Sequence, residues 1–236
     1  MNYALLLSGG IGTRIGTNMP KQYVKAGGHM MVSYALMPLL KCAYIDEVYI
    51  VSEHEWREII VADTKEMGVD IDKIKGYALP GENRQSSILN GMEEIVSSRE
   101  NELSYEDTIM IHDAARPFVT EDILNECYVS LNGHDGVMPV LPMKDTVYHS
   151  DDGRRISKLL DRQKIFAGQA PELFRMKKYY DANIDLVPYK INTVNGATEP
   201  AIMHRMDIAM ITGDENNFKV TTREDLSEFI RIKEGE

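Results

Sequence analysis

The sequence predicts an α/β protein with a mostly parallel, twisted sheet and an inserted β-hairpin arm. Two observations predict it. Short apolar segments alternate with amphipathic helical segments through the first two-thirds of the 236 residues, and the alternation stops at a segment with the pattern of a hairpin. We expect one domain over residues 1–236, with the arm at about 142–165. In open sheets of this kind, ligands bind beyond the carboxyl ends of the strands.

The individual elements are expected in the following order. Apolar runs predict strands at 3–7, 47–51, 75–78, 108–112, 136–140 and 208–212. Helices are predicted at about 30–40, 53–67, 175–186 and 198–205, and after the N-capping residues Asn83, Thr120 and Thr222. Pro38 is expected to kink or shorten the first helix. Asp151-Asp152-Gly153 is expected to turn the hairpin between 146–150 and 154–159.

Composition excludes several classes of function. The net charge of −11 argues against general affinity for nucleic acid, which depends on basic surface. No apolar run approaches the roughly 20 residues that span a bilayer, and the first residues lack the basic flank of a signal peptide. We therefore expect a cytoplasmic protein without a membrane partner. Cys42 and Cys127 have apolar neighbours, which predicts buried, reduced thiols.

The first candidate site is the glycine-rich loop after the first strand, Ser8-Gly9-Gly10-Ile11-Gly12-Thr13-Arg14-Ile15-Gly16. Glycine lets a backbone approach phosphate closely, and Arg14 and Lys21 add two cations. The loop has no Gly-Lys pair, so it is not a P-loop. Its glycine at Gly16 falls one position late for the dinucleotide fingerprint. We interpret the loop as a polyphosphate cradle, and a glycine turn without a ligand is the alternative.

Four further constellations are candidates. His112–Pro117 follows a central strand, where Asp113 can hold a ribose hydroxyl or a divalent metal ion and Arg116 a phosphate; a loop-stabilising ion pair is the alternative. Gly81–Ser87 combines small hydroxyls with a helix N-terminus, which can hold an anion or only cap the helix. Lys219, between apolar residues, can reach phosphate or lie on an edge strand. On the arm, 144–146 and 161–162 can receive a second substrate, or form an ordinary solvated hairpin.

Taken in order, these motifs resemble one family, the CTP-dependent cytidylyltransferases for sugar-alcohol phosphates. One branch of that family makes 4-diphosphocytidyl-2-C-methyl-D-erythritol for isoprenoid biosynthesis, and a sister group acts on ribitol 5-phosphate for capsule or teichoic acid. Each motif is weak alone, but the ordered set spans nearly the whole chain. The residues that carry the resemblance are Gly9–Arg14, Pro20–Gln22, Gly81–Arg84, His112–Pro117, Lys144–Thr146 and Lys219–Thr221.

The resemblance implies a Rossmann-like nucleotidyltransferase fold, a Mg²⁺ ion, and a homodimer formed through the β-arm. The acceptor that it implies is 2-C-methyl-D-erythritol 4-phosphate. The implied residues are Arg14, Lys21 and Lys219 for catalysis; Ser8, Gly9, Gly10, Gly12, Gly81, Arg84, Ser87, Asp113 and Ala114 for the nucleotide; Asp113 for the metal; and Thr146, Arg162 and Arg116 for the acceptor.

Departures from the family pattern concern the acceptor half. Asn195–Pro200 stands where the methylerythritol enzymes usually carry an acidic motif, and Asn216 stands where an Asp is common. Ala170-Pro171-Glu172 replaces a frequent Thr-Pro-Gln, while Gly168-Gln169 is similar to the ribitol group. Two alternatives therefore stay open beside the methylerythritol acceptor. One is ribitol 5-phosphate or a related polyol phosphate, and the other is a nucleotide-binding protein without turnover.

Overall fold

The computed structural model describes residues 1–10, 19–100 and 102–235. Its centre is an eight-stranded sheet in the order β10-β7-β11-β6-β1-β4-β5, with β12 on the other edge of β7. The strands of this sheet are β1 (Asn2–Leu7), β4 (Glu47–Val51), β5 (Ile74–Ala78), β6 (Thr108–Asp113), β7 (Gly136–Pro142), β10 (Phe166–Gly168), β11 (Glu172–Arg175) and β12 (Ile208–Thr212). The predicted α/β fold with a mostly parallel sheet is confirmed.

Helices cover both faces of the sheet because alternate residues of the central strands are apolar on each side. Leu6 and Met110 face one core together with residues of α1, α2 and α4, whereas Leu5 and Ile111 face the other together with α3, α5 and α6. The helices are α1 (Met31–Lys41), α2 (His54–Glu66), α3 (Arg84–Ser98), α4 (Glu121–Ser130), α5 (Met176–Ile184), α6 (Thr198–Met203) and α7 (Arg223–Glu234). Short 3₁₀ turns lie at η1 (Lys21–Tyr23), η2 (Arg162–Lys164) and η3 (Ile191–Thr193).

The predicted caps are confirmed. The Asn83 side chain accepts a hydrogen bond from the backbone N–H of Ser86 at the start of α3, and Thr120 caps α4 in the same way. Thr222 and Asp225 form a reciprocal capping box at the start of α7. Pro38 does not shorten α1, which continues to Lys41, because the chain beyond the proline still closes a bond onto the Pro38 carbonyl.

The parallel register brings three strand ends to one place. Leu7 of β1 lies opposite Val51 of β4 on one side and opposite Asp113 of β6 on the other. The loops that leave β1 and β6 therefore start side by side at the carboxyl edge of the sheet. This is the edge at which open α/β sheets bind ligands.

Two strands of the sheet were not predicted. β10 and β11 are short pieces on the same edge of β7, and both run antiparallel to it. β11 also pairs antiparallel with β6, so it separates the four parallel strands β5-β4-β1-β6 from β7 and β12. Runs of three and four residues beside Pro171 carry too little periodicity to be recognised as strands.

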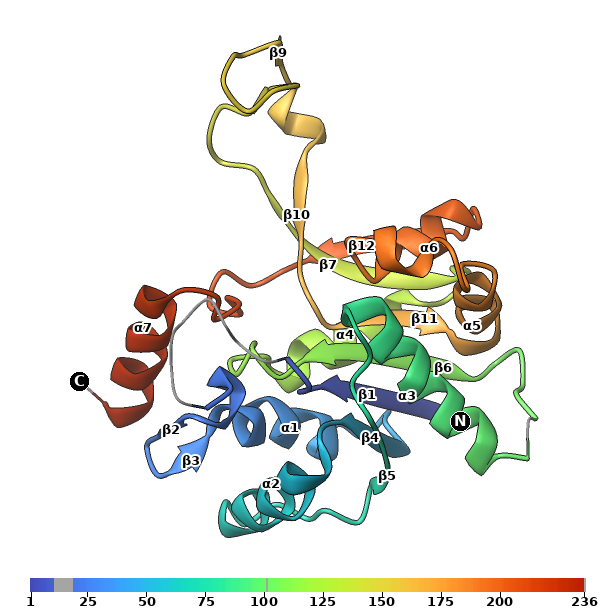
Figure 1. Cartoon of the computed structure of the whole chain (residues 1–236), viewed down its shortest axis with the longest axis vertical. Helices are drawn as coiled ribbons and strands as arrows, with labels where there is room; N and C mark the ends of the chain where they lie inside the picture. The colour runs from blue at the N-terminus through green and yellow to red at the C-terminus, as the bar shows by residue number, and fades with distance from the viewer. Residues whose placement is uncertain (11–18, 101, 236) are drawn as a thin grey trace.

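The chain between β7 and β10 projects away from the sheet (Figure 1). The predicted hairpin pairing is present there, but only over two residues in each strand, β8 (Tyr148–His149) and β9 (Lys158–Leu159). Apolar side chains are exposed on this projection, at Tyr148, Ile156 and Leu159, and at its base, at Phe166 of β10. A second short hairpin, β2 (Lys25–Ala26) with β3 (His29–Met30), packs against α7.

Candidate active site

A pocket of about 510 Å³ opens at the carboxyl edge of the sheet. Its walls come from the end of β1, η1, the turn before α3, the end of β6, and the segment that precedes α7. The lining residues are Leu7, Gly9, Gly10, Lys21, Gln22, Glu53, Pro80–Arg84, Ser87, Asp113–Ala115, Lys219 and Thr221. Four of the five constellations predicted from the sequence therefore contribute to one pocket.

Asp113 is the centre of the pocket's ion network. Its Oδ1 accepts a hydrogen bond from Arg84 Nε at 3.0 Å, and its Oδ2 accepts one from Lys219 Nζ at 2.7 Å. The Nη2 atom of Arg84 lies 3.3 Å from Oε2 of Glu172, which starts β11. Two cations thus alternate with two carboxylates, drawn from α3, β6, β11 and the segment before α7.

Charge decides the ionisation state of Asp113. Burial alone would raise the pKa of this carboxyl, but the neighbouring Arg84 and Lys219 charges outweigh it and hold the pKa well below its usual range. The opposite balance holds at Glu172, where burial outweighs the attraction of Arg84 and raises the pKa. Asp113 is therefore a permanent anion at any working pH.

A buried glutamine and tyrosine fix the start of the glycine loop. Gln22 Nε2 donates to the carbonyls of Ser8 and Gly10 at 2.5 and 2.7 Å, and the Tyr23 hydroxyl donates to the Ser8 carbonyl at 2.9 Å. The Tyr23 ring is stacked on Trp56 of α2. Because these carbonyls face η1, the backbone of the loop is oriented by side chains and not by the loop alone.

Two glycines are required by close contacts in the pocket wall. A Cβ on Gly9 would lie 2.3 Å from Cγ of Pro80, and a Cβ on Gly81 would lie 2.4 Å from Cβ of Ser86. The Gly81 N–H donates to the hydroxyl of Ser87 at 3.0 Å. At Gly10, by contrast, a Cβ would meet no atom within 4 Å. Gly10 therefore leaves open space next to the pocket.

The segment before α7 brings Lys219 and Lys21 together. Lys21 Nζ donates to the Val220 carbonyl, and the Val220 N–H donates to the Ala115 carbonyl at 2.8 Å. Phe218–Val220 is not a strand, so the alternative of an edge-strand lysine is wrong. Instead, backbone contacts with the loop after β6 hold the segment across the pocket, with Lys219 aimed at Asp113.

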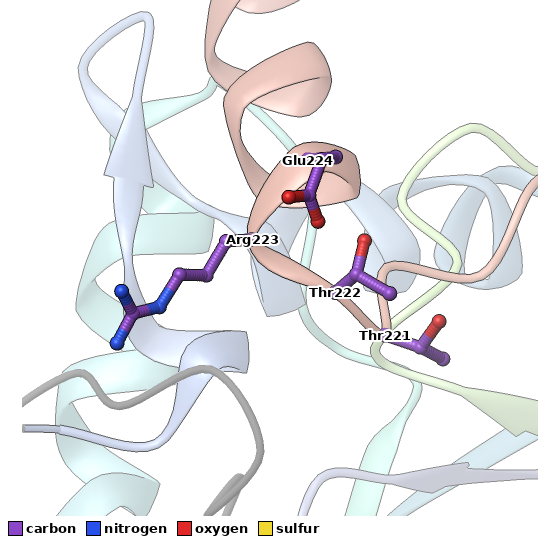
Figure 2. Close-up of a pocket in the computed structure, with 4 residues that line it drawn as sticks. All are labelled: Thr221, Thr222, Arg223 and Glu224. Carbon is purple, nitrogen blue, oxygen red and sulfur yellow. The ribbon is translucent and has the colours of Figure 1, made fainter.

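A neighbouring pocket lies at the start of α7, lined by Thr221, Thr222, Arg223 and Glu224 (Figure 2). It resembles an anion site, since helix N-termini expose backbone N–H groups. Here, however, the carboxylate of Asp225 accepts the N–H groups of both Thr221 and Thr222, at 2.7 and 2.8 Å. These two N–H groups are therefore already bonded within the protein and are not available to an anion.

Four predicted site residues lie elsewhere. Ser8 is buried and its hydroxyl donates to the Val51 carbonyl at 2.8 Å, so it supports the pocket from behind. Arg116 does not pair with Asp113; its Nη1 donates to the Asn217 carbonyl at 2.6 Å, outside the pocket lining. Thr146 and Arg162 are exposed on the projecting segment, where Arg162 donates to the Lys144 carbonyl at 2.7 Å. Gly12 and Arg14 lie outside the described residues.

Sequence reasoning missed three contributors to the site. Glu172 was noticed only as a departure from the family pattern, and its strand was not predicted. Gln22 was quoted as part of a motif without a role, although it holds two loop carbonyls. Glu53, from the turn after β4, lines the pocket. A signal was present for Glu53, since it follows a parallel strand whose end meets the same edge.

One further group of possible metal ligands lies away from the pocket. His29, Asp63 and Glu66 bring ligand atoms within 4.8 Å of one another. Lys25 Nζ already lies 2.9 Å from Asp63 Oδ1, while Ser33 and Met30 donate to Oδ2. This carboxylate is thus already paired with one cation and accepts two hydrogen bonds within the protein. The two cysteines are free and buried, as predicted.

Within the described residues, no helix has both the length and the apolar character that crossing a membrane requires.

Known proteins of one family are similar to this chain over nearly its whole length. A family model described as IspD: 2-C-methyl-D-erythritol 4-phosphate cytidylyltransferase matches residues 3–231. The enzyme of that name from Syntrophus aciditrophicus is 29% identical, with 98% of this chain and 97% of that protein covered. Bcs1 of Haemophilus influenzae is a bifunctional ribulose 5-phosphate reductase/CDP-ribitol pyrophosphorylase. It is also 29% identical to this chain, and the match covers 95% of this chain and 46% of the longer Bcs1 protein.

A solved structure gives the same picture of the fold. The 4-diphosphocytidyl-2C-methyl-D-erythritol synthase from Anaerococcus prevotii superposes with a TM-score of 0.79 at 21% identity, covering 98% of this chain and 95% of that chain. At this identity the likeness establishes a shared fold, the Rossmann-like nucleotidyltransferase fold that the motifs implied. Together with the family match over nearly the whole chain, it leads to one assignment: the chain belongs to the 2-C-methyl-D-erythritol 4-phosphate cytidylyltransferase family of nucleotidyltransferases.

Proposed function

We propose that the chain transfers the cytidylyl group of CTP to 2-C-methyl-D-erythritol 4-phosphate and releases pyrophosphate, as a step of isoprenoid biosynthesis in the cytoplasm. The observation that carries the proposal is the alternating network of Arg84, Asp113, Lys219 and Glu172 at the carboxyl edge of the sheet. It lies in a pocket whose glycine-lined wall admits a backbone approach to phosphate.

The reaction joins two polyanions. A phosphate oxygen of the acceptor attacks the α-phosphorus of CTP, a new P–O bond forms, and the bond to the β-phosphate oxygen breaks as pyrophosphate leaves. The acceptor phosphate is already ionised, so no side chain has to remove a proton. Positioning the two reactants can supply ~7–11 kcal/mol of the barrier reduction. A fixed donor such as Lys21 at the developing charge adds about 3 kcal/mol.

The other predicted residues have roles consistent with this chemistry. Gly9, Gly10, Gly12, Gly81, Ser87 and Ala114 would surround the nucleoside and the phosphates, with Ser8 behind them. Arg14 and Lys219 would stabilise the transferring phosphate. Thr146, Arg162 and Arg116 would serve the acceptor.

Mg²⁺ would enter with the triphosphate. The lining residues fit such an ion, because Asp113 is an anion at the pocket centre and Mg²⁺ in nucleotide sites is usually held by one or two carboxylates plus substrate phosphates. Both Asp113 oxygens already accept bonds from cations, so the phosphates would be the main ligands. Bound Mg²⁺ would offset the repulsion between the two substrates.

The acceptor residues on the arm favour a homodimer. Thr146 and Arg162 are exposed, and among the described residues no hydrogen bond is recorded between their side chains and the pocket lining of their own chain. The arm also exposes Tyr148, Ile156 and Leu159, apolar surface that a second copy would cover. We therefore propose one nucleotidyltransferase domain per chain, residues 1–236, whose arm at about 142–165 completes the partner's acceptor site.

A pyrophosphate-release assay with CTP and Mg²⁺ tests the proposed function. Release with 2-C-methyl-D-erythritol 4-phosphate supports it. Release with ribitol 5-phosphate instead selects the second candidate, which the likeness to Bcs1 and the Gly168-Gln169 pair favour. CTP binding without release from either acceptor contradicts both, and would mean a nucleotide-binding protein without turnover.

Mixed dimers test whether the arm acts across the dimer. Lys21→Ala and Arg162→Ala chains, co-expressed with different tags, are each expected to be nearly inactive alone when the acceptor is kept well below the raised KM of the Arg162→Ala chain. If the arm serves the partner's site, a mixed dimer contains one intact site. Random pairing then restores about a quarter of wild-type activity, since half of the dimers are mixed and each has one working site of two. If the purified mixed dimer recovers no activity, the arm contributes to the site of its own chain and not to that of the partner.

A further inference from the structure

Glu172 reaches the nucleotide pocket from a strand that no motif marks. In the β11–β6 pairing it stands opposite Ile111, so the two side chains project from the same face of the sheet. Asp113 lies two residues beyond Ile111 and projects from that face as well. This is the face covered by α3, whose first residue is Arg84. Strand register therefore places the carboxylates of Asp113 and Glu172 next to the guanidinium of Arg84, one on each side.

Burial makes a carboxylate at this position costly. Glu172 is 9% exposed, and a buried charge is destabilising unless it is paired and hydrogen-bonded. Burial raises its pKa, against the attraction of Arg84. Among the described residues, Arg84 Nη2 at 3.3 Å is the only hydrogen-bond donor recorded to the Glu172 side chain. The burial of this carboxylate is thus offset by one recorded polar contact, the one with Arg84.

That contact fixes the plane of the guanidinium. Arg84 donates through Nε to Asp113 and through Nη2 to Glu172, and two carboxylates on separate nitrogens restrict rotation of a planar fork more than one does. The side chain of Arg84 is 29% exposed and lines the pocket. No bond is recorded from its Nη1 within the described part of the chain, so this nitrogen remains for a pocket ligand.

We propose that Glu172 is a positioning residue of the nucleotide site, which acts through Arg84 by holding the guanidinium so that Nη1 serves a phosphate or nucleoside oxygen of bound CTP. The inference rests on the proposed function for the identity of the ligand. It assigns a role to a side chain that touches no substrate. It also predicts the opposite of simple electrostatics, in which removing a carboxylate beside a polyanion site tightens binding.

The test measures CTP affinity by calorimetry in the presence of Mg²⁺, together with kcat and both KM values. Glu172→Leu removes the acceptor, and the expected result is a CTP Kd about tenfold higher, the scale of one charge-assisted hydrogen bond, with the acceptor KM unchanged. Glu172→Gln removes the charge but keeps an oxygen for Arg84. It is expected to bind CTP equally or up to about threefold more weakly.

An Arg84→Ala background separates positioning from other effects. Once Arg84 is absent, Glu172→Leu is expected to change the CTP Kd no further. Glu106→Gln is the matched control, since it removes an exposed carboxylate that pairs with Arg175 at 3.0 Å, away from the pocket. It is expected to leave Kd and kcat unchanged.

Three results would overturn the inference while leaving the proposed function intact: CTP binding that is unaffected in Glu172→Leu, an equal loss in the Arg84→Ala background, or clearly tighter binding by Glu172→Gln. The last decides the matter even if the leucine variant does not fold. A wild-type chain that binds no CTP would instead overturn the proposed function itself.

Discussion

His112 predicts a loss of stability on acidification that can be isolated experimentally. The side chain is fully buried in β6, and its Nε2 donates to the Arg116 carbonyl at 3.2 Å. The carbonyl can only accept, so Nε2 carries the proton of the neutral ring and Nδ1 does not. Nδ1 is buried and has no hydrogen-bond partner among the described residues. A proton on Nδ1 would therefore be an unpaired donor in the core.

The size of the effect follows from the pKa. Burial lowers the pKa of His112 to about 4, against an ordinary value of 6.5. Between these values the unfolded chain binds a proton that the folded chain does not, so folding loses stability as the pH falls. A shift of this size corresponds to about 3 kcal/mol at 1.36 kcal/mol per pKa unit. The loss begins near pH 6.5 and is complete near pH 4.

Urea unfolding of the wild type and of His112→Gln, measured from pH 7.5 to pH 4, checks this expectation. Glutamine can keep a donor for the Arg116 carbonyl but does not titrate. Carboxylates that titrate near the low end contribute to both proteins, and the difference between the two curves removes them. The wild type should lose about 3 kcal/mol more than the variant. Parallel curves would refute the assignment of a neutral, buried His112.

Three substitutions test the catalytic role of Lys21, the acceptor role of the arm, and the ion network around Asp113. Lys21→Ala should lower kcat far more than CTP affinity, because its charge matters most as the α-phosphate reorganises; near-normal turnover would remove it from catalysis. Arg162→Ala should raise the acceptor KM and leave the CTP Kd unchanged. Loss of CTP binding in this variant would contradict the assignment of Arg162 on the arm to the acceptor site. Asp113→Asn leaves Arg84 and Lys219 without their shared anion. It should destabilise the fold by about 3–5 kcal/mol in denaturant titrations, and a cost below about 1 kcal/mol would contradict a tightly coupled network.

Much of the fold was predictable because its main elements carry their own signals. The strands at β1, β4 and β6 are continuous apolar runs, and the helices after Asn83, Thr120 and Thr222 begin at residues whose side chains cap them. The short strands β10 and β11 have no such signal. Their conformation is imposed by the neighbours β6 and β7, which a local pattern cannot encode.

In the candidate site too, residues with a local sequence signal were predictable, whereas contacts between distant parts of the chain were not. Asp113 was predictable because it ends an apolar strand at the ligand edge, and Lys219 because it is a lysine between two apolar residues, Phe218 and Val220. Their mutual contact, across 106 positions of sequence, was not predictable. Arg116 shows the reverse case. An ion pair with its neighbour Asp113 was the alternative to a role at phosphate, yet the loop after β6 turns the Arg116 side chain toward the Asn217 carbonyl. Sequence proximity is a poor guide to pairing when a long-range partner is already in place.

The balance of charge in the network gives it a function beyond holding cations. Arg84 and Lys219 are matched by Asp113 and Glu172, so the four side chains together carry no net charge. Without the carboxylates, two cations this close would repel each other and orient poorly; with them, both are ordered before a ligand arrives. The same carboxylates weaken the attraction for a triphosphate. In a chain with a net charge of −11, we therefore propose that this attraction comes from the cations outside the network, Arg14 and Lys21, and from the Mg²⁺ ion that the nucleotide would bring. In this proposal the network contributes geometry, and part of the positive charge that drives binding would enter with the substrate.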